Sequence, residues 1–305
     1  MASIVAQPAL SIERDAPIPT WFGIGGRADR LCRPASVEQL RECLKIDPSL
    51  RVLGEGANLL VDDEGVRELI VALSAGAFTS TEFRDDGTVV AGAGADLAKL
   101  IVDAARRGRA GLEGLAGIPA TVGGAAIMNA GGAFGQVSDV IARVHALDRA
   151  GREVVLERTQ IGFDYRRSGL NDLVLTSVEF NLPPADPRVL RERLKDVMAY
   201  KKRSQPMAER SAGCVFKNPT LPHDVADIGP AGSRTSAGML IDRAGCKGLR
   251  LGGASVSPRH ANFIVTDRAA TARAVIELMQ QVAARVQDAF GVTLEPEVVI
   301  WRRSR

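Results

Sequence analysis

The thiol of Cys214 is the first side chain in this sequence that could take part in chemistry. It lies in the segment RSAGCVFKNP (residues 210–219), with Lys217 and Asn218 close behind it. A thiol has a reference pKa of about 8.5, so it is mostly protonated at neutral pH and far more acidic than a serine hydroxyl. Cys214 is therefore a candidate general acid, and the alternative is a cysteine that only fills space.

Two further segments carry charged residues that could belong to a site. FDYRRSGL (163–170) contains Arg166 within an arginine pair, and a fixed guanidinium can hold a carboxylate through two hydrogen bonds. LEPEVVIW (294–301) places Glu295 and Glu297 near the end of an expected core strand, where an acid is unexpected unless it faces a polar cavity. An arginine pair is also a common solvated surface feature, so that interpretation stays open.

A cationic helix end and one histidine are weaker candidates. The segment YKKRSQP (200–206) packs three cations and two polar residues, which is typical either of an anion clamp or of a helix C-terminal cap. His260 is equally consistent with a substrate contact and with a hydrogen-bonded structural histidine.

Glycine-rich loops predict a site for an anionic ligand. GEGANLLV (54–61) and GLEGLAGIPATVGGAAIMNAGG (111–132) are rich in glycine and alanine where strands should end. Consecutive N–H groups without side chains form concave anion sites, so a pyrophosphate across both loops is the natural guest. Tight strand crossings are the alternative, but Asn58, Thr121 and Asn129 favour a site because each is polar among glycines or apolar neighbours.

The segment VVAGAGADLAKL (89–100) has the strand, glycine turn and helix order of a Rossmann fingerprint. The third glycine of that fingerprint would stand at position 97, which is Leu97, and no acidic strand end follows about 20 residues on. We therefore interpret Gly92 and Gly94 as turn or bulge residues.

The elements that must position these residues fall into two parts. Short β-like runs broken by glycine fill residues 20–182, with a helix predicted over 96–107 behind Asp96 as its N-cap. PPADPR (183–188) is the best linker candidate, and helical spacing follows up to Pro206 and again over about 270–290. We expect domains at 1–185 (core about 20–182) and 186–305, the second of α+β type.

Composition excludes several classes of function. The 305 residues carry 39 basic and 36 acidic residues mixed along the chain, a net charge of +3, so neither nucleic acid nor a membrane is expected as a partner. The N-terminus has no targeting pattern and no run approaches 18 apolar residues, so we expect a cytoplasmic protein. The four cysteines are widely spaced without a histidine cluster, which predicts free thiols and no metal site.

Six ordered blocks resemble the UDP-N-acetylenolpyruvoylglucosamine reductase (UDP-N-acetylmuramate dehydrogenase) family. They are GEGANLLV, GIPATVGGAAIMNAGG, FDYRRSGL, SAGCVFKNP, AGMLIDRAGCKG and LEPEVVIW, and the resemblance covers residues 20–301. It implies an α+β protein with a two-subdomain FAD-binding region of the vanillyl-alcohol-oxidase (PCMH) type and a C-terminal α+β substrate-binding domain. It further implies FAD, NADPH as co-substrate, and a UDP-sugar substrate in peptidoglycan precursor synthesis. We also expect a monomer.

The resemblance also implies roles for individual residues. The catalytic positions are Arg166, Cys214 and Glu297. The FAD-binding positions are Gly54, Glu55, Gly56, Ala57, Asn58, Leu59, Gly117, Ile118, Pro119, Thr121, Gly123, Gly124, Met128 and Asn129. We predict the substrate-binding positions Tyr200, Lys201, Arg203, Gln205, Lys217, Asn218 and His260.

The sequence departs from the family pattern in several places. The proton donor in much of the family is serine, whereas Cys214 stands here, and the chain is too short for the tyrosine-bearing insertion of some members. Trp21 and the segment 221–235 are also unusual.

Two other functions remain alternatives at this point. One is another FAD-dependent oxidase or dehydrogenase of the same flavin superfamily, which oxygen consumption would favour. The other is a non-catalytic nucleotide-sugar-binding module, which would purify colourless, whereas both enzymes would be yellow. The protonation state of Glu297 is likewise open.

Overall fold

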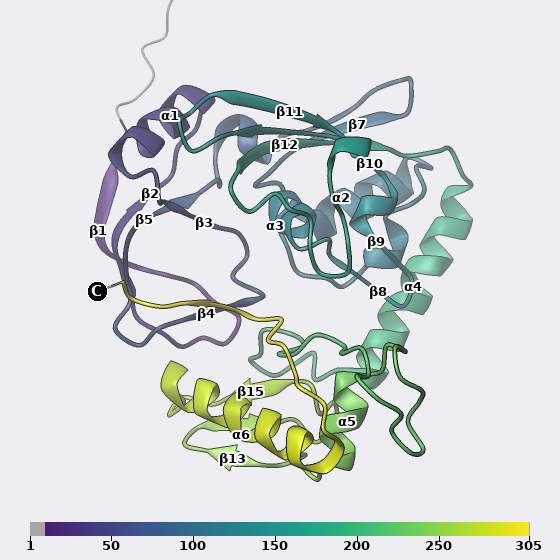
Figure 1. Ribbon diagram of the computed structural model, residues 1–305. Helices are drawn as coiled ribbons and strands as arrows, with labels where there is room; N and C mark the ends of the chain where they lie inside the picture. Colours follow the sequence, from purple (N-terminus) through teal and green to yellow (C-terminus); the bar gives the residue numbers. More distant parts are fainter. Residues whose placement is uncertain (1–9, 305) are drawn as a thin grey trace, which may run out of the picture.

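The computed structural model describes residues 10–304, which form a first sheet region, a second sheet region and a C-terminal region (Figure 1). Within these residues, no helix is both long and apolar enough to cross a membrane. The four cysteines are free thiols, and no cluster of three or more potential metal ligands occurs in the described chain.

The first region begins earlier in the chain than the sequence pattern indicates. Its elements are β1 (Ile12–Pro17), β2 (Arg27–Cys32), α1 (Val37–Ile46), β3 (Arg51–Leu53), β4 (Leu59–Val61) and β5 (Val66–Ala72). The sheet has the order β1-β2-β5-β3, with β2 and β3 parallel to β5. β1 lies before residue 20, and the sequence pattern did not predict it. It is an edge strand with mostly exposed side chains, so it lacks the alternation of apolar residues by which a strand is recognised.

The second region is a five-stranded antiparallel sheet in the order β11-β10-β12-β7-β6. Its elements are η1 (Gly76–Thr79), β6 (Thr81–Phe83), β7 (Thr88–Gly92), α2 (Leu97–Arg106), η2 (Glu113–Leu115), α3 (Val122–Ile127), β8 (Gly131–Gly132), β9 (Gly135–Gln136), η3 (Val137–Asp139), β10 (Ile141–Leu147), β11 (Glu153–Glu157), η4 (Arg158–Gln160) and β12 (Val174–Asn181). One core spans this sheet and the first region, from Cys32 and Leu69 to Val144 and Phe180.

The strand and helix around Gly92 are not a Rossmann unit. β7 pairs antiparallel with both β6 and β12, so it cannot be the first strand of a parallel βαβ crossover. A Cβ at Gly94 would lie 1.6 Å from the Leu73 carbonyl oxygen, so this glycine allows two backbones to cross. The predicted helix is confirmed as α2, and the Asp96 side chain accepts the N–H groups of Ala98 and Lys99 at 2.8 and 3.2 Å.

The C-terminal region packs helices on a small antiparallel sheet. Its elements are α4 (Pro187–Ser204), α5 (Ala237–Arg243), β13 (Arg250–Leu251), β14 (Ala254–Val256), β15 (Ile264–Thr266), α6 (Ala272–Phe290) and β16 (Val299–Trp301). The helix predicted over about 270–290 is confirmed as α6, which ends at Gly291 in the left-handed conformation (φ 64°). α4 leads down from the second region (Figure 1), and the expected linker 183–188 already contains the N-cap Asp186 and the first two helical residues, Pro187 and Arg188.

The end of the chain returns to the first region, and Figure 1 shows it crossing from α6 back to β4. β16 pairs in parallel with β4, from Val299 opposite Leu59 to Trp301 opposite Val61. Asp63 accepts the N–H groups of Ala272 and Arg273 at 2.8 and 3.0 Å, and so satisfies orphan donors at the start of α6. The first and C-terminal regions are therefore joined by main-chain pairing and by this shared helix cap.

We expect Asp63→Ala to lower the free energy of unfolding by about 1 kcal/mol, since a lost helix-capping carboxylate typically costs that much. Thermal unfolding should show a lower midpoint for Asp63→Ala and none of that loss for Asp288→Ala, which removes an exposed acid from the same helix. An unchanged midpoint for Asp63→Ala would show that water replaces the carboxylate without cost.

Candidate active site

The structure brings Arg166, Cys214 and Glu297 together from three distant segments. Arg166 Nε donates a hydrogen bond to Glu297 Oε1 at 2.5 Å, and these side chains are only 19% and 13% exposed. Cys214 lies close enough to both charges for each to change the pKa of its thiol. The geometry thus gathers a proton-bearing thiol, a fixed cation and a buried carboxyl group.

Arg166 is held in a tight turn between η4 and β12. Asp164 and Arg167 exchange main-chain hydrogen bonds of 2.9 and 3.1 Å across this turn. Arg166 adopts a left-handed backbone (φ 55°), a strained conformation that is uncommon for a residue with a long side chain. The buried Asn129 supports the turn, because its Nδ2 donates to the Asp164 carbonyl at 3.0 Å.

The segment that contains Cys214 lies between the segment of Phe263 and the segment of Glu297 and pairs with both. Cys214 forms an antiparallel bridge with Phe263, and Glu297 N–H donates to the Val215 carbonyl at 2.8 Å on the other side. The amide of Asn262 clamps Phe216, accepting its N–H at 3.0 Å and donating to its carbonyl at 2.8 Å. Sequence reasoning missed Asn262, although an asparagine between apolar neighbours in a strand-like run was the available signal.

Burial changes the acidity of the thiol that the sequence suggested. It raises the pKa of Cys214 to about 12, with a further increase from the Glu297 carboxylate and an opposing effect of Arg166. The thiol is therefore held firmly protonated at neutral pH, but it is a weaker acid than an exposed cysteine. Burial also raises the pKa of Glu297, and this effect outweighs the attraction of Arg166.

The raised pKa predicts how Cys214 responds to alkylation by iodoacetamide. Only the thiolate reacts, and a pKa of about 12 means that its fraction keeps rising tenfold per pH unit throughout the alkaline range. The rate for the Cys214 peptide, followed by mass spectrometry, should therefore still increase at pH 10, whereas an ordinary thiol levels off near its pKa of about 8.5. A plateau near that ordinary value would contradict the raised pKa.

The two glycine-rich loops contact each other next to this cluster. A Cβ at Gly54 would lie 2.9 Å from Thr121 Oγ1, and the same oxygen accepts the Gly124 N–H at 3.2 Å at the start of α3. Gly56 and Gly117 adopt left-handed backbones (φ 65° and 73°). A Cβ at Gly54 would therefore meet the second loop, whereas a Cβ at Gly56 would meet the Pro19 carbonyl at 2.2 Å and one at Gly117 would meet the Met198 sulfur at 2.7 Å.

Main-chain donors in the first loop are free to bind a ligand. Among residues 10–304, the N–H groups of Glu55, Gly56, Ala57 and Asn58 donate no hydrogen bond. A run of such donors fits the diphosphate of FAD. The Asn58 side chain is instead directed to the catalytic segment, where Nδ2 donates to the Glu297 carbonyl at 3.0 Å. The loop therefore fits the cofactor and also positions Glu297.

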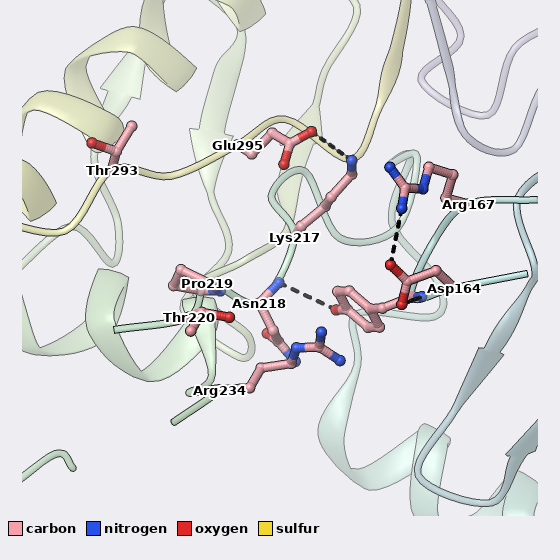
Figure 2. Close-up of a pocket in the computed structure, with 10 residues that line it drawn as sticks. Asp164, Arg167, Lys217, Asn218, Pro219, Thr220, Arg234, Thr293 and Glu295 are labelled. Carbon is pink, nitrogen blue, oxygen red and sulfur yellow. Dashed lines mark hydrogen bonds and ion pairs between the residues drawn. The ribbon is translucent and has the colours of Figure 1, made fainter. Parts of the chain in front are cut away.

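A pocket of about 400 Å³ opens beside the catalytic cluster (Figure 2). Its lining includes the predicted Lys217 and Asn218, and the Asn218 N–H donates to the Tyr165 hydroxyl at 3.2 Å. Lys217 Nζ pairs with Glu295 Oε1 at 2.6 Å. The other lining residues are Asp164, Arg167, Pro219, Thr220, Arg234 and Thr293.

The remaining predicted substrate residues lie elsewhere. Lys201 at the end of α4 donates to the Ala116 carbonyl at 2.6 Å, beside the second glycine loop, and burial with the charge of Arg166 lowers its pKa to about 8. The Tyr200 ring packs edge-on against Phe134. The Arg203 side chain is exposed, Gln205 follows the helix as its C-cap, and His260 Nδ1 accepts the Asn262 N–H at 3.3 Å. None of these lines the pocket in Figure 2, so their contact with substrate stays a prediction.

Two family models match the chain. Residues 28–157 match an FAD binding domain, and residues 205–301 match the C-terminal domain of UDP-N-acetylenolpyruvoylglucosamine reductase. These matches bear out the fold class predicted from the sequence, an FAD-binding region followed by a separate C-terminal domain.

Proteins of known family are similar over nearly the whole chain. The UDP-N-acetylenolpyruvoylglucosamine reductase of Desulfosudis oleivorans is 41% identical, covering 92% of this chain and 91% of its own. That of Moorella thermoacetica is 40% identical over 92% and 90%. The crystal structure of the Thermus caldophilus enzyme superposes with a TM-score of 0.81 at 38% identity, covering 96% of this chain and all of that one. The chain with its thiol, arginine and glutamate cluster belongs to the UDP-N-acetylenolpyruvoylglucosamine reductase family.

Proposed function

We propose that this protein reduces the enolpyruvyl group of UDP-N-acetylglucosamine enolpyruvate to UDP-N-acetylmuramate, with bound FAD and with NADPH as the co-substrate. The observation that carries the proposal is the meeting of Arg166, Cys214 and Glu297 beside two glycine loops that fit FAD. The family membership supports the same reaction. The product feeds peptidoglycan precursor synthesis.

Arg166 is the residue that we assign to the substrate carboxylate. An enolpyruvyl ether is an alkene conjugated to a carboxylate, so addition at its terminal carbon places negative charge on the carboxylate side. Arg166 Nε donates to Glu297, while the two terminal nitrogens of the Arg166 guanidinium make no hydrogen bond within residues 10–304. They are free to hold the carboxylate with two parallel bonds, and a permanent charge placed before the reaction gives strong stabilisation.

Glu297 orients Arg166 and adds to the same stabilisation. The ion pair fixes the guanidinium plane, and Asn58 and Val215 hold the Glu297 main chain from both sides. Because burial raises the pKa of Glu297, proton uptake is easier here than on an exposed glutamate, and the neutral form could donate to the developing enediolate. When bound, FAD supplies the electron carrier that lets NADPH and the sugar nucleotide react in turn.

Cys214 delivers the final proton in this proposal. Its thiol is protonated at neutral pH, and the carbanion at the substrate α-carbon is a far stronger base than a thiolate, so a pKa of about 12 does not prevent transfer. Arg166 is close enough to stabilise the thiolate that remains until solvent reprotonates it. The overall reaction consumes one NADPH and one proton per double bond reduced.

Replacing Glu297 should distinguish its neutral form from its charged form. We expect Glu297→Gln to reduce kcat about tenfold and Glu297→Ala to reduce it about 10²-fold, because an amide still donates a hydrogen bond and contacts Arg166. Steady-state NADPH oxidation measures both values. Equal losses in the two variants would mean that the negative charge itself is required.

The boundaries and the setting of the protein are part of this proposal. We retain 1–185 as the FAD-binding region and 186–305 as the substrate-binding region, which the extents of the family matches support. Residues 1–9 lie outside the described structure. We also propose a monomer working in the cytoplasm, where NADPH and nucleotide sugars are available.

The direct test of the reaction is the mass of the product. Purified protein incubated with NADPH and the enolpyruvyl sugar nucleotide should give a product heavier by two hydrogen atoms, and in deuterium oxide the α-carbon of the product should carry deuterium. Unchanged substrate, or oxygen consumption driven by an alcohol, would favour the alternative oxidase instead.

A further inference from the structure

One cation of the pocket in Figure 2 makes no direct ion pair in the described structure. Lys217 pairs with Glu295 at 2.6 Å, and Arg167 pairs with Asp164 at 3.2 Å. The guanidinium of Arg234 makes no ion pair and no hydrogen bond within residues 10–304. The pKa of Asp164 is lowered by the Tyr165 N–H and, less strongly, by the charges of Arg167 and Arg234, so Asp164 lies near the Arg234 guanidinium without contacting it. The Arg234 guanidinium lies over the ring of Tyr165, with its central carbon 4.2 Å from the ring centroid. In this arrangement, the N–H donors at the rim of the guanidinium plane stay free for a ligand.

The segment 221–235 holds Arg234 in this position. Leu221 N–H donates to the Ser233 carbonyl at 2.9 Å, and Thr235 N–H donates to the Pro219 carbonyl at 3.0 Å, so the two ends of the loop are paired. Leu221 itself is 1% exposed in the C-terminal core. This loop departs from the family pattern. Its two ends are hydrogen-bonded to each other as the strands of a hairpin are, and this pairing places Arg234 in the lining of the pocket.

We propose that Arg234 binds the diphosphate of the sugar nucleotide, with the ring of Tyr165 setting the plane of its guanidinium. The inference rests on the proposed function and extends it to a residue that the sequence did not indicate. Tyr165 directly precedes Arg166, so a diphosphate held at Arg234 keeps the attached sugar near the catalytic cluster. A planar guanidinium with free donors can meet two phosphate oxygens at once.

NADPH also carries phosphates, and the lining of the pocket favours the sugar nucleotide. Apart from Asp164, Tyr165 and Arg167, the lining comes from the C-terminal region, including Lys217, Asn218 and Thr293. That region matches the C-terminal domain of the reductase family, not the FAD binding domain. We therefore assign Arg234 to the sugar nucleotide, and the experiment tests NADPH separately.

Binding of UDP and of uridine to the FAD-loaded protein, measured by calorimetry, tests the assignment without turnover. Arg234→Ala should weaken UDP binding about 10- to 100-fold, the usual loss for a charge-assisted hydrogen-bond pair, and leave the affinity for uridine unchanged. Arg234→Lys should recover part of the loss, since it restores the charge but not the fork. The matched control Arg273→Ala, an exposed arginine on α6, should behave like the parent protein.

Steady-state kinetics supplies the second arm. Arg234→Ala should raise KM for the enolpyruvyl sugar nucleotide to a similar extent, with kcat nearly constant and KM for NADPH unchanged. Tyr165→Leu should show a smaller rise in the same KM, and Tyr165→Phe, which keeps the ring, should retain more affinity than Tyr165→Leu.

The possible failures are distinguishable. Parental UDP affinity in Arg234→Ala, or a rise in KM for NADPH instead of the sugar nucleotide, overturns the assignment while the proposed reaction stands. A parent protein that binds UDP through Arg234 but reduces no enolpyruvyl group overturns the proposed function alone. A parent protein that neither binds UDP nor reduces the enolpyruvyl group overturns both.

Discussion

Replacing Cys214 with alanine is expected to slow the half-reaction with the enolpyruvyl substrate by roughly 10²- to 10⁴-fold, the usual loss when a positioned acid is removed. Electron transfer from NADPH needs no proton at the sugar, so the half-reaction with NADPH should keep close to its parental rate. Anaerobic stopped-flow measurement of the FAD absorbance separates the two steps.

Cys214→Ser tests whether the loss in Cys214→Ala is due to the missing proton donor. Cys214→Ser should recover part of the lost rate, because a hydroxyl can occupy the same place between Glu297 and Asn262 and relay a proton. If Cys214→Ala reacts with the enolpyruvyl substrate as fast as the parent, water or another side chain is the donor. Loss of both half-reactions would show that Cys214 is needed for the architecture of the site.

Replacing Arg166 with lysine is expected to reduce kcat by about 10²- to 10³-fold, while the protein still binds FAD. Lysine keeps the charge, but it has no planar fork that pairs with Glu297 through one nitrogen and with a substrate carboxylate through the others. Steady-state kinetics gives kcat, and the visible spectrum gives the FAD content.

A matched exchange elsewhere controls for the general effect of losing a guanidinium. Arg188→Lys changes an exposed residue at the start of α4 and should leave both kcat and FAD content at parental values. Near-parental kcat in Arg166→Lys would show that the reaction needs only a positive charge at position 166 and not a bidentate contact with the substrate carboxylate.

Local patterns and the ordered motifs together predicted a large part of this molecule. The Asp96 cap and the 3.6-residue spacing behind it were sufficient for α2, because capping and amphipathicity are local properties. The catalytic residues Arg166, Cys214 and Glu297 came from the motifs of the family resemblance, and the structure brings them together. Their roles stay predictions.

Features that depend on long-range contacts could not be predicted. The pairing of β16 with β4 joins residues about 240 apart, and no local pattern specifies such a partner. Arg234 enters the pocket only because the ends of its loop pair and Tyr165 lies opposite. The pKa of Cys214 likewise depends on how tightly distant segments exclude water around the thiol, which composition does not reveal.

The absorbance of FAD during an anaerobic titration tests the central claim most directly. The purified protein should be yellow, lose its visible absorbance when NADPH is added, and recover it when the enolpyruvyl sugar nucleotide follows in equal amount. Recovery with this substrate, but not with UDP-N-acetylglucosamine, is the result that the proposed reaction predicts. A colourless protein, or a bleached one that the enolpyruvyl substrate fails to restore, would contradict it.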